Sequence, residues 1–300
     1  MAKENNNEKL FESLGFQWDR SSIPENVPIH DVSRACFRLN KMLAQYVFDA
    51  SVLEGNPFTY PQVKTILDGV TVGGHKLSDE DQVRNLAAST KELLRLVKAG
   101  EFQLDKNTFT AIHAIVAREE AFEWGNFRGE GREKNYTPHV GLGTEEDYIP
   151  PATQDGAPVL NKIFSEGLRN LEKLPNPLER GMAFFLFGAL QQFYFDGNKR
   201  TSRMMMNGVL MSNGIDAISI PATRAQEFNE KMVDFYVNKD ATAMMEFMVD
   251  CHPDASLMKV VVLDDKKKDQ PSLSDVAARV KTVRGKHLGS SGESENKPKP

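Results

Sequence analysis

The chain has 300 residues, which is long enough to bury a substantial core in one large domain, with or without appendages. Hydrophobic residues make up 40% of it and charged residues 26%, the balance of an ordinary soluble globular protein. The formal net charge of −5 argues against a dedicated nucleic-acid binder, which usually has a strongly basic face. No uncharged apolar run approaches the roughly 20 residues that a membrane span needs.

The cysteines and the first residues bear on the compartment. Cys36 and Cys251 both lie in apolar helical patterns, and we interpret them as small buried hydrophobes in a reducing compartment. The opening MAKENNNEKLFESLG is polar and lacks the apolar core of a secretory signal. We therefore predict a cytoplasmic protein that has neither nucleic acid nor a membrane as a partner. The sequence leaves its oligomeric state open.

The chain begins with an N-terminal extension, residues 1–30, which we expect to be loosely ordered because Pro24 and Pro28 break any long element. A helix is predicted to begin at Asp31, its N-cap, and to end before the sequence EGNP at residues 54–57. An apolar stripe at spacings of three and four residues supports this helix: Val32, Ala35, Leu39, Leu43, Tyr46, Val47, Ala50 and Leu53.

Helical periodicity recurs along most of the remaining chain. It predicts helices over residues 60–67, 78–99, 106–121, 157–174, 177–193, from 198 onward, 223–238 and 240–252. Residues 124–151 lose this periodicity and are rich in glycine and charge, as in a functional loop, and Tyr136–Leu142 is predicted as one strand of a short hairpin. The predicted fold is mostly α with a short β-hairpin flap over residues 31–253. Residues 254–300 are predicted to be a linker and a partly disordered tail.

The sequence FDGNKRTSR, residues 195–203, has the chemistry of an anion-binding loop between two apolar helices. Gly197 permits a turn in which backbone N–H groups point into one concavity, and the first N–H groups of the next helix carry the positive end of its dipole. Arg200 and Arg203 lie three residues apart on that helix and can add bidentate contacts, while Asp196 can hold Mg²⁺. The alternative is an ordinary turn between helices with solvated arginines.

At this point the sequence resembles the Fic (Fido) family. Its signature is H-x-F-x-[D/E]-G-N-[G/K]-R-x-x-R, and six of the eight specified positions are met, by Asp196, Gly197, Asn198, Lys199, Arg200 and Arg203. Tyr194 replaces the phenylalanine, and Gln192 replaces the histidine. SVLEGNPFTYPQV at residues 51–63 resembles the family's inhibitory-helix segment, and YTPHVGLGTEEDYIPP at residues 136–151 resembles its flap. The resemblance spans roughly residues 31–250.

The resemblance implies an ATP- and Mg²⁺-dependent transfer of AMP to a hydroxyl side chain of a target protein. Asp196 would then bind the metal, Gly197, Asn198 and Lys199 would line the anion site, and Arg200 and Arg203 would contact phosphates. The flap would pair with an extended target segment. Its predicted residues are Tyr136, Thr137, Pro138, His139, Val140 and Gly141.

Two residues modify this expectation. The resemblance implies that Glu54 pairs with Arg203 and competes with the γ-phosphate, although Ala50 stands where the inhibitory motif has Ser or Thr. The alternative is that Glu54 simply ends a helix. Gln192 cannot take a proton from an attacking hydroxyl, and the loss of a general base costs about 10²- to 10⁴-fold in rate. His139 is the neighbouring replacement candidate, with a plain surface histidine as the alternative, and His113 is interpreted as a core residue.

Three functions therefore remain open from the sequence. The first is a slow or impaired protein adenylyltransferase, the second is an inactive nucleotide-binding scaffold that recognises a partner protein, and the third is a helical adaptor without a nucleotide. The intact anion loop is compatible with the first two, and Gln192 favours the second. The sequence does not identify the target protein, and it does not say whether Gln192 is the natural residue.

Overall fold

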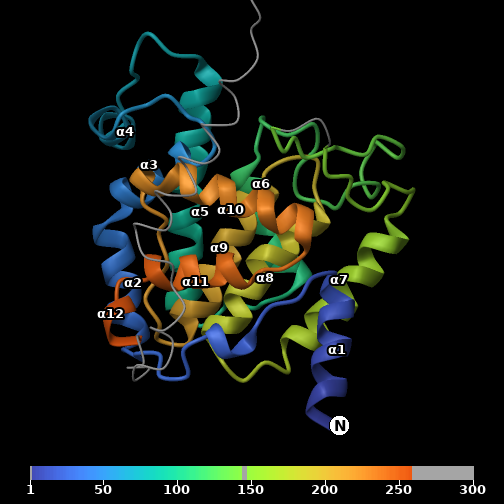
Figure 1. Cartoon of the computed structure of the whole chain (residues 1–300). Coiled ribbons are helices and arrows are strands. Elements are labelled where there is room, and N and C mark those ends of the chain that lie inside the picture. Colours follow the sequence, from blue (N-terminus) through green and yellow to red (C-terminus); the bar gives the residue numbers. More distant parts are fainter. Residues whose placement is uncertain (1, 144–146, 259–300) are drawn as a thin grey trace, which may run out of the picture. The chain divides into compact units, whose positions relative to one another are not determined.

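Helices make up nearly all the regular structure of the described residues, 2–143 and 147–258, in this computed structural model (Figure 1). These residues belong to one compact unit. The helices are α1 Ala2–Leu14, α2 Val32–Lys41, α3 Leu43–Val52, α4 Tyr60–Leu67, α5 Leu77–Lys98, α6 Lys106–Val116, α7 Pro158–Leu171, α8 Pro177–Gln191, α9 Asn198–Ser212, α10 Ala225–Asn238, α11 Thr242–Cys251 and α12 Ala255–Met258, with short 3-10 helices at Arg20–Ser22 and Ala222–Arg224.

The antiparallel pair α8 and α9 forms the centre of the fold, with α2, α5 and α6 packed on α9 and α7 on α8 (Figure 1). Asn176 caps α8 by accepting hydrogen bonds from the N–H groups of Leu178 and Glu179. All but two of the fifteen residues of α8 are buried, as the nearly all-round apolar sequence from Gly181 onward predicts. Gly188 allows the close approach of α9, because a Cβ there would lie 2.0 Å from Ser202 Oγ.

Aromatic rings fill the space beneath the α8–α9 connection. Phe109 of α6 is fully buried and contacts Phe164 of α7 in a stacked pair, with ring centroids 5.7 Å apart. Phe193, just after α8, packs edge-on to both rings. Burial of each such side chain stabilises the fold by about 1.5–3 kcal/mol, so the connection rests on a rigid base.

Residues 2–30 are more ordered than the sequence suggests. Leu14 of α1 and then Phe16 and Trp18 are buried, and Gln17 forms a parallel bridge with Asp240. The expectation of a loosely ordered extension was wrong because the two prolines lie after these contacts. The apolar residues Leu10 to Trp18 are far enough upstream to dock on the core before the chain is interrupted.

Two predicted helices are shorter than expected. The long helix from Asp31 divides into α2 and α3 at Met42, whose backbone leaves the helical region with φ −98° and ψ 14°. The sequence does not reveal this break, because the apolar residues keep their spacing of three and four on both sides of Met42. Helix α6 ends at Val116 instead of continuing to Ala121, and Glu119 takes a left-handed conformation with φ 60°.

The predicted β-hairpin flap is not formed as strands in the part of the chain that the structure describes. One isolated antiparallel bridge joins Val140 to Tyr148, and each residue's N–H donates to the other's carbonyl at 2.9 Å. Pro138, Gly141 and Gly143 limit further pairing on the first arm, since proline lacks a donor and glycine is a poor strand former. The structure describes residues 254–258 of the predicted linker, and Ala255–Met258 form α12. The rest of the predicted linker and tail lies outside the described residues.

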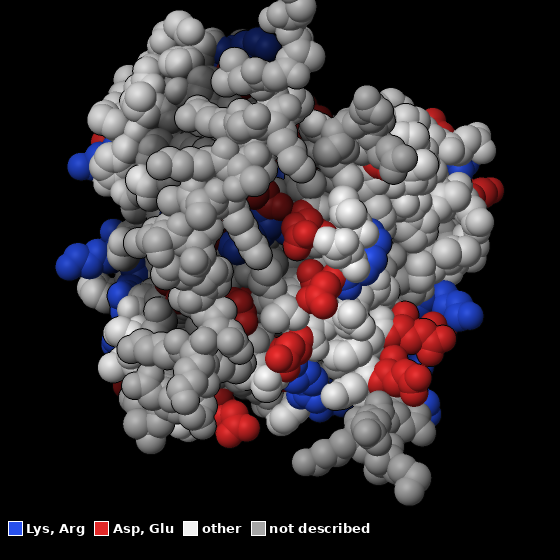
Figure 2. Space-filling model, in the orientation of Figure 1, with Lys and Arg blue, Asp and Glu red and all other residues white. Residues whose placement is uncertain are grey.

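Two surface properties bear on the expected partners. Within the described ranges, no helix is long and apolar enough to cross a membrane. On the visible part of the face in Figure 2, basic and acidic side chains are interspersed, in keeping with the small net charge.

Candidate nucleotide site

The connection between α8 and α9 turns through two left-handed residues, Gln192 (φ 49°) and Gly197 (φ 73°). Asn198 holds the turn closed. Its side-chain Nδ2 donates to Tyr194 O at 2.8 Å, and its Oδ1 accepts from Tyr194 N at 2.9 Å. A Cβ on Gly197 would lie 3.2 Å from Ala117 Cβ, so both the left-handed conformation and the limited space favour glycine.

His113 of α6 fixes the same loop from below. Its ring stacks on Tyr194 with centroids 3.6 Å apart, and its Nε2 donates to Asp196 O at 3.0 Å. Nδ1 accepts from Gly125 N at 3.1 Å, so both nitrogens are used. Burial lowers the pKa of His113 to about 3, which keeps the ring neutral. The interpretation of His113 as a core residue agrees with this environment, and the ring also positions the backbone of Asp196.

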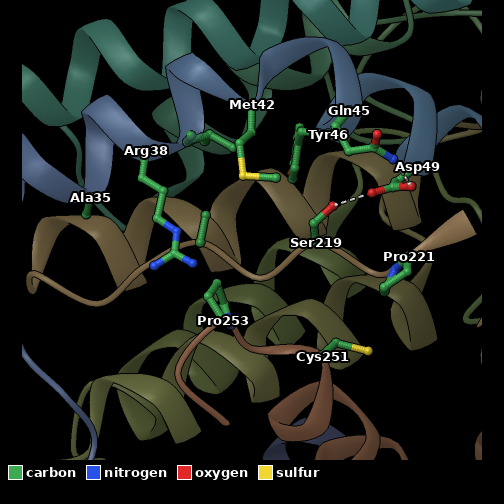
Figure 3. Close-up of a pocket in the computed structure, with 12 residues that line it drawn as sticks. Ala35, Arg38, Met42, Gln45, Tyr46, Asp49, Ser219, Pro221, Cys251 and Pro253 are labelled. Atoms are coloured by element: carbon green, nitrogen blue, oxygen red, sulfur yellow. Dashed lines mark hydrogen bonds between the residues drawn. The ribbon is translucent and has the colours of Figure 1, made fainter. Parts of the chain in front are cut away.

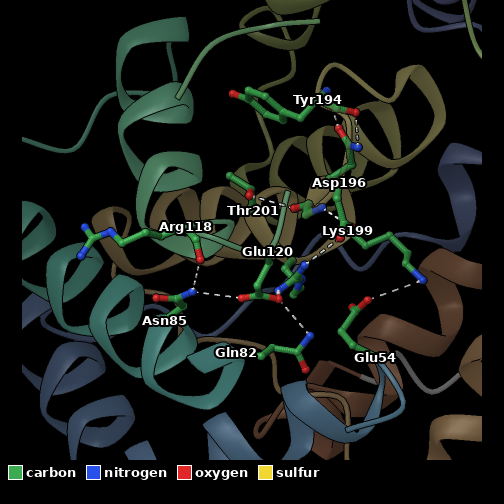
Figure 4. Close-up of polar contacts among 12 residues, drawn as sticks. Glu54, Gln82, Asn85, Arg118, Glu120, Tyr194, Asp196, Lys199 and Thr201 are labelled. Carbon is green, nitrogen blue, oxygen red and sulfur yellow. Dashed lines mark hydrogen bonds and ion pairs between the residues drawn. The ribbon is translucent and has the colours of Figure 1, made fainter. Parts of the chain in front are cut away.

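Arg200 lies on the first turn of α9 and is only 3% exposed. Its Nη1 donates to Glu120 Oε2 at 2.6 Å, and its Nη2 lies 3.5 Å from Asp196 Oδ2. Glu120 is itself held by two amides of α5, with Gln82 Nε2 donating at 3.1 Å and Asn85 Nδ2 at 3.0 Å (Figure 4). Because α6 ends at Val116, the chain that follows it places Glu120 beside Arg200 as its counter-ion.

Arg203, one turn further along α9, pairs with Glu54. Arg203 Nη2 donates to Glu54 Oε1 at 2.8 Å. Lys199 Nζ lies 3.9 Å from Glu54 Oε2, as Figure 4 shows. The contact predicted from the sequence is thus present. Burial raises the pKa of Glu54, but the positive charges of Lys199, Arg203 and Arg200 outweigh it and lower that pKa to about 2. Glu54 is therefore a carboxylate at neutral pH.

The two arginines retain unused hydrogen-bond donors. Among the described residues, Arg200 Nε and Arg203 Nη1 are buried side-chain atoms that have no hydrogen-bond partner. An unpaired buried donor on a charged group is costly, because it has lost water and gained nothing in return. Two such donors on adjacent turns at a helix N-terminus are what an anion of several oxygens would satisfy.

A cavity of about 300 Å³ brings the loop and the flap together. Glu54 and Tyr236 form part of its wall, and the rest comes from Pro138, His139, Val140, Gly141, Gln192, Phe195, Asp196, Gly197, Asn198 and Lys199. Arg200 and Arg203 are not among the lining residues, and their guanidinium groups pair with Glu120 and Glu54. Tyr136 and Thr137 also lie outside the cavity: Tyr136 stacks on Phe195, and Thr137 Oγ1 accepts from Thr153 N at 2.8 Å.

Gln192 is buried and fully engaged. Its Nε2 donates to Ala189 O at 2.6 Å, and its Oε1 accepts from Asn198 Nδ2 at 2.9 Å. Arg128 donates from Nε to the carbonyl of Gln192 at 2.5 Å, and its other nitrogens reach Thr153 and Pro151. Gln192 thus closes the loop as a structural amide and offers no basic atom.

Sequence reasoning missed Glu120, Arg128 and Tyr236. Glu120 lies in a stretch that was predicted to be helical, and its partner Arg200 is 80 residues away. Arg128 is fully buried, although it lies in a segment whose composition suggested an exposed loop. Tyr236 OH donates to Ala189 O at 3.0 Å beside Gln192. No local pattern identifies these contacts, because each depends on how distant segments pack.

A second cavity, of about 240 Å³, lies between α2, α3 and the segment after α9 (Figure 3). Its wall is mainly apolar, and Met42, Tyr46 and Cys251 contribute to it. Asp49 at one end already accepts from Ala222 N at 3.0 Å and from Ser219 Oγ at 3.3 Å. The guanidinium in its wall, Arg38, is paired with Asp216, whereas the loop site is next to the unpartnered donor atoms Arg200 Nε and Arg203 Nη1.

Known proteins resemble the chain over most of its length. It is 25% identical over 254 residues to a protein adenylyltransferase Fic from Culex quinquefasciatus, covering 83% of this chain and 47% of the relative. The values for the Aedes aegypti protein of that name are 25% over 252 residues, with the same coverage. The chain therefore spans about half the length of the curated relatives it matches. No family model matches it.

Solved structures show the same fold. A Fic domain containing signaling protein from Bacteroides thetaiotaomicron superposes with a TM-score of 0.60 at 16% identity, over 96% of this chain and all of the other. Fic-1 from C. elegans gives 0.58 at 17% identity, over 86% of this chain and 72% of the other. The fold is that of Fic domain proteins, and the names of the relatives support the same family.

Proposed function

We propose that the chain binds ATP with Mg²⁺ at the N-terminus of α9 and transfers AMP slowly to a hydroxyl group of a target protein. The observation that carries the proposal is the pair of buried, unpartnered donors, Arg200 Nε and Arg203 Nη1, beside the left-handed turn at Gly197. Phosphate oxygens would satisfy both donors and the free N–H groups of the first turn. The relatives named as adenylyltransferases support the reaction class.

The implied metal fits the residues that the loop presents. Asp196 has a side chain that is 60% exposed, next to the arginines, and a carboxylate is a ligand that Mg²⁺ prefers. The ion would supply charge neutralisation of the phosphates at this carboxylate. Arg200 and Arg203 would fix the phosphate chain, and the flap at Val140 would position the target segment beside it.

Proton removal is the weak step. The attacking hydroxyl must lose its proton, and Gln192 has no basic atom and is already hydrogen-bonded at both ends. The missing base costs about 10²- to 10⁴-fold in rate, equivalent to about 3–5 kcal/mol of barrier. His139 is the one imidazole among the cavity-lining residues, so it is the residue to test as a substitute.

A second function, a nucleotide-loaded scaffold that recognises a partner without modifying it, is favoured by the engagement of Gln192. The two functions separate in one experiment. Wild type, Gln192→His and His139→Gln are incubated with α-labelled ATP, Mg²⁺ and candidate proteins, and label in protein is measured. Label from the wild type that falls in His139→Gln supports the enzyme with His139 as base. Label that appears only with Gln192→His supports the scaffold. If none of the three proteins binds ATP in a separate binding measurement, both functions are contradicted.

A further inference from the structure

A polar cluster lies at the opposite end of α9 from the loop. His30 precedes α2, Asp216 follows α9, and Asp254 lies between α11 and α12. One ring nitrogen of His30 and one carboxylate oxygen from each aspartate all lie within 4.8 Å of one another. Helix α9 has fifteen residues and is therefore about 22 Å long, so this cluster is separate from the nucleotide site.

The backbone that carries these side chains is fixed without any ion. His30 N donates to Gly214 O at 2.7 Å, and a Cβ on Gly214 would lie 2.1 Å from His30 O. The ring of His252 joins the two aspartate segments, because its Nε2 donates to Asp216 O at 2.9 Å and its Nδ1 accepts from Asp254 N at 3.0 Å. The backbone contacts therefore bring the side chains of His30, Asp216 and Asp254 together before any ion binds.

The side-chain hydrogen bonds leave one acceptor unused. Asp216 is 1% exposed, and its Oδ2 accepts from Arg38 Nη1 at 2.7 Å. Its Oδ1 is buried and has no hydrogen-bond partner among the described residues. His30 Nε2 lies 2.8 Å from Asp254 Oδ2. A buried carboxylate oxygen without a donor costs free energy, so the cluster lacks one positive or donating partner.

We propose that His30, Asp216 and Asp254 bind a divalent transition-metal ion of the Zn²⁺ type. An imidazole nitrogen with two carboxylate oxygens is a mixed ligand set that suits Zn²⁺, whereas Mg²⁺ and Ca²⁺ favour oxygen ligands alone. Ligand atoms around Zn²⁺ lie about 2.0–2.2 Å from the metal, so small side-chain rotations bring the three donors to that distance. Water completes the fourth position.

Arg38 sets the strength of this site. Its guanidinium, which lies beside the second cavity (Figure 3), donates to Oδ2 of Asp216 and orients the carboxylate. Its charge also opposes a cation, and Arg34 adds a weaker contact to the same oxygen at 3.4 Å. The affinity is therefore lower than that of a structural site with four protein ligands. The ion ties the segment before α2 to the C-terminal ends of α9 and α11.

The test is a titration of the metal-free full chain with ZnCl₂, without nucleotide, followed by calorimetry and thermal unfolding. Wild type and Asp81→Asn, a change at an exposed aspartate of α5, should each bind one ion. At a Zn²⁺ concentration about 100 times the Kd, their Tm should rise by roughly 5–10 °C. Asp216→Asn and His30→Gln should lose the saturable binding and the rise in Tm.

His30 is partly exposed, so His30→Gln keeps the test decisive if Asp216→Asn does not fold. A shift of the His30 ring nitrogens in NMR spectra on Zn²⁺ addition would identify the ligand directly. No saturable binding by the wild type, or equal binding by His30→Gln, would overturn the proposal.

Discussion

Replacement of Glu54 by glycine tests whether its carboxylate blocks the nucleotide site. In the structure Glu54 is 15% exposed on its side chain and contacts Arg203 at 2.8 Å. Its pKa falls from 4.5 to about 2, which corresponds to about 3 kcal/mol of net interaction with the surrounding positive charges. ATP must break this interaction if its phosphates use the same guanidinium group.

The expected result is therefore tighter binding. Removal of the Glu54 carboxylate should make up to about 3 kcal/mol of binding free energy available to ATP, and the greater backbone flexibility of glycine offsets part of it. The Kd for ATP with Mg²⁺ should therefore fall by about 10- to 100-fold. Isothermal titration measures it. Glu54→Gln, which keeps the shape but removes the charge, should give an intermediate gain. Glu246→Gln, at an exposed position of α11, should bind like the wild type.

Equal ATP affinity in Glu54→Gly and wild type would show that Glu54 and the nucleotide do not compete. Weaker binding in Glu54→Gly would show instead that the carboxylate supports the site. Circular dichroism of both proteins serves as the control that the fold is intact.

Four further results follow from the same contacts. Gln192→His should raise the rate of labelled AMP transfer by about 10²- to 10⁴-fold, and an unchanged rate would mean that this position does not limit proton removal. Because the pKa of Glu54 is lowered, its stabilising effect is present above pH 4.5 and is lost as pH falls towards 2. The free energy of unfolding, measured in urea, should therefore fall by about 3 kcal/mol more for the wild type than for Glu54→Gln over this pH range. An equal dependence of this free energy on pH in the two proteins would contradict the shift. Gly197→Ala forces a left-handed alanine, with φ 73°, against Ala117 and should cost about 1–2 kcal/mol and weaken ATP binding; unaltered Tm and Kd would refute this. Glu120→Ala removes the hydrogen-bonded counter-ion of the buried Arg200, although Asp196 remains 3.5 Å away. The change should lower the free energy of unfolding by about 3 kcal/mol, so a loss below about 1 kcal/mol in urea would contradict the role of Glu120.

The parts of the site that sequence reasoning predicted are those with a local cause. The apolar run of α8, the glycine turn and the start of α9 follow from residues adjacent in the chain, so their periodicity and turn chemistry were sufficient. The contact of Glu54 with Arg203 spans 149 residues, and only the resemblance to a known family indicated it.

The remaining features depend on tertiary packing. The break at Met42 lies within a stripe whose spacing is the same on both sides, so periodicity alone cannot reveal it. Residues Leu10 to Trp18 become ordered because the core offers them a docking surface. The strand predicted for residues 136–142 stops at a single bridge, since no neighbouring strand is present among the described residues to extend it. Arg128 was unpredictable because its acceptors, such as the carbonyl of Gln192, are positioned by the folded loop.

The most direct test of the account is a crystal structure of Glu54→Gly grown with saturating ATP and Mg²⁺. The account predicts the triphosphate at the first turn of α9, with Arg200 Nε and Arg203 Nη1 donating to its oxygens and the metal at Asp196. Nucleotide bound elsewhere, or a loop without nucleotide in which both arginines keep unpaired donors, would contradict it.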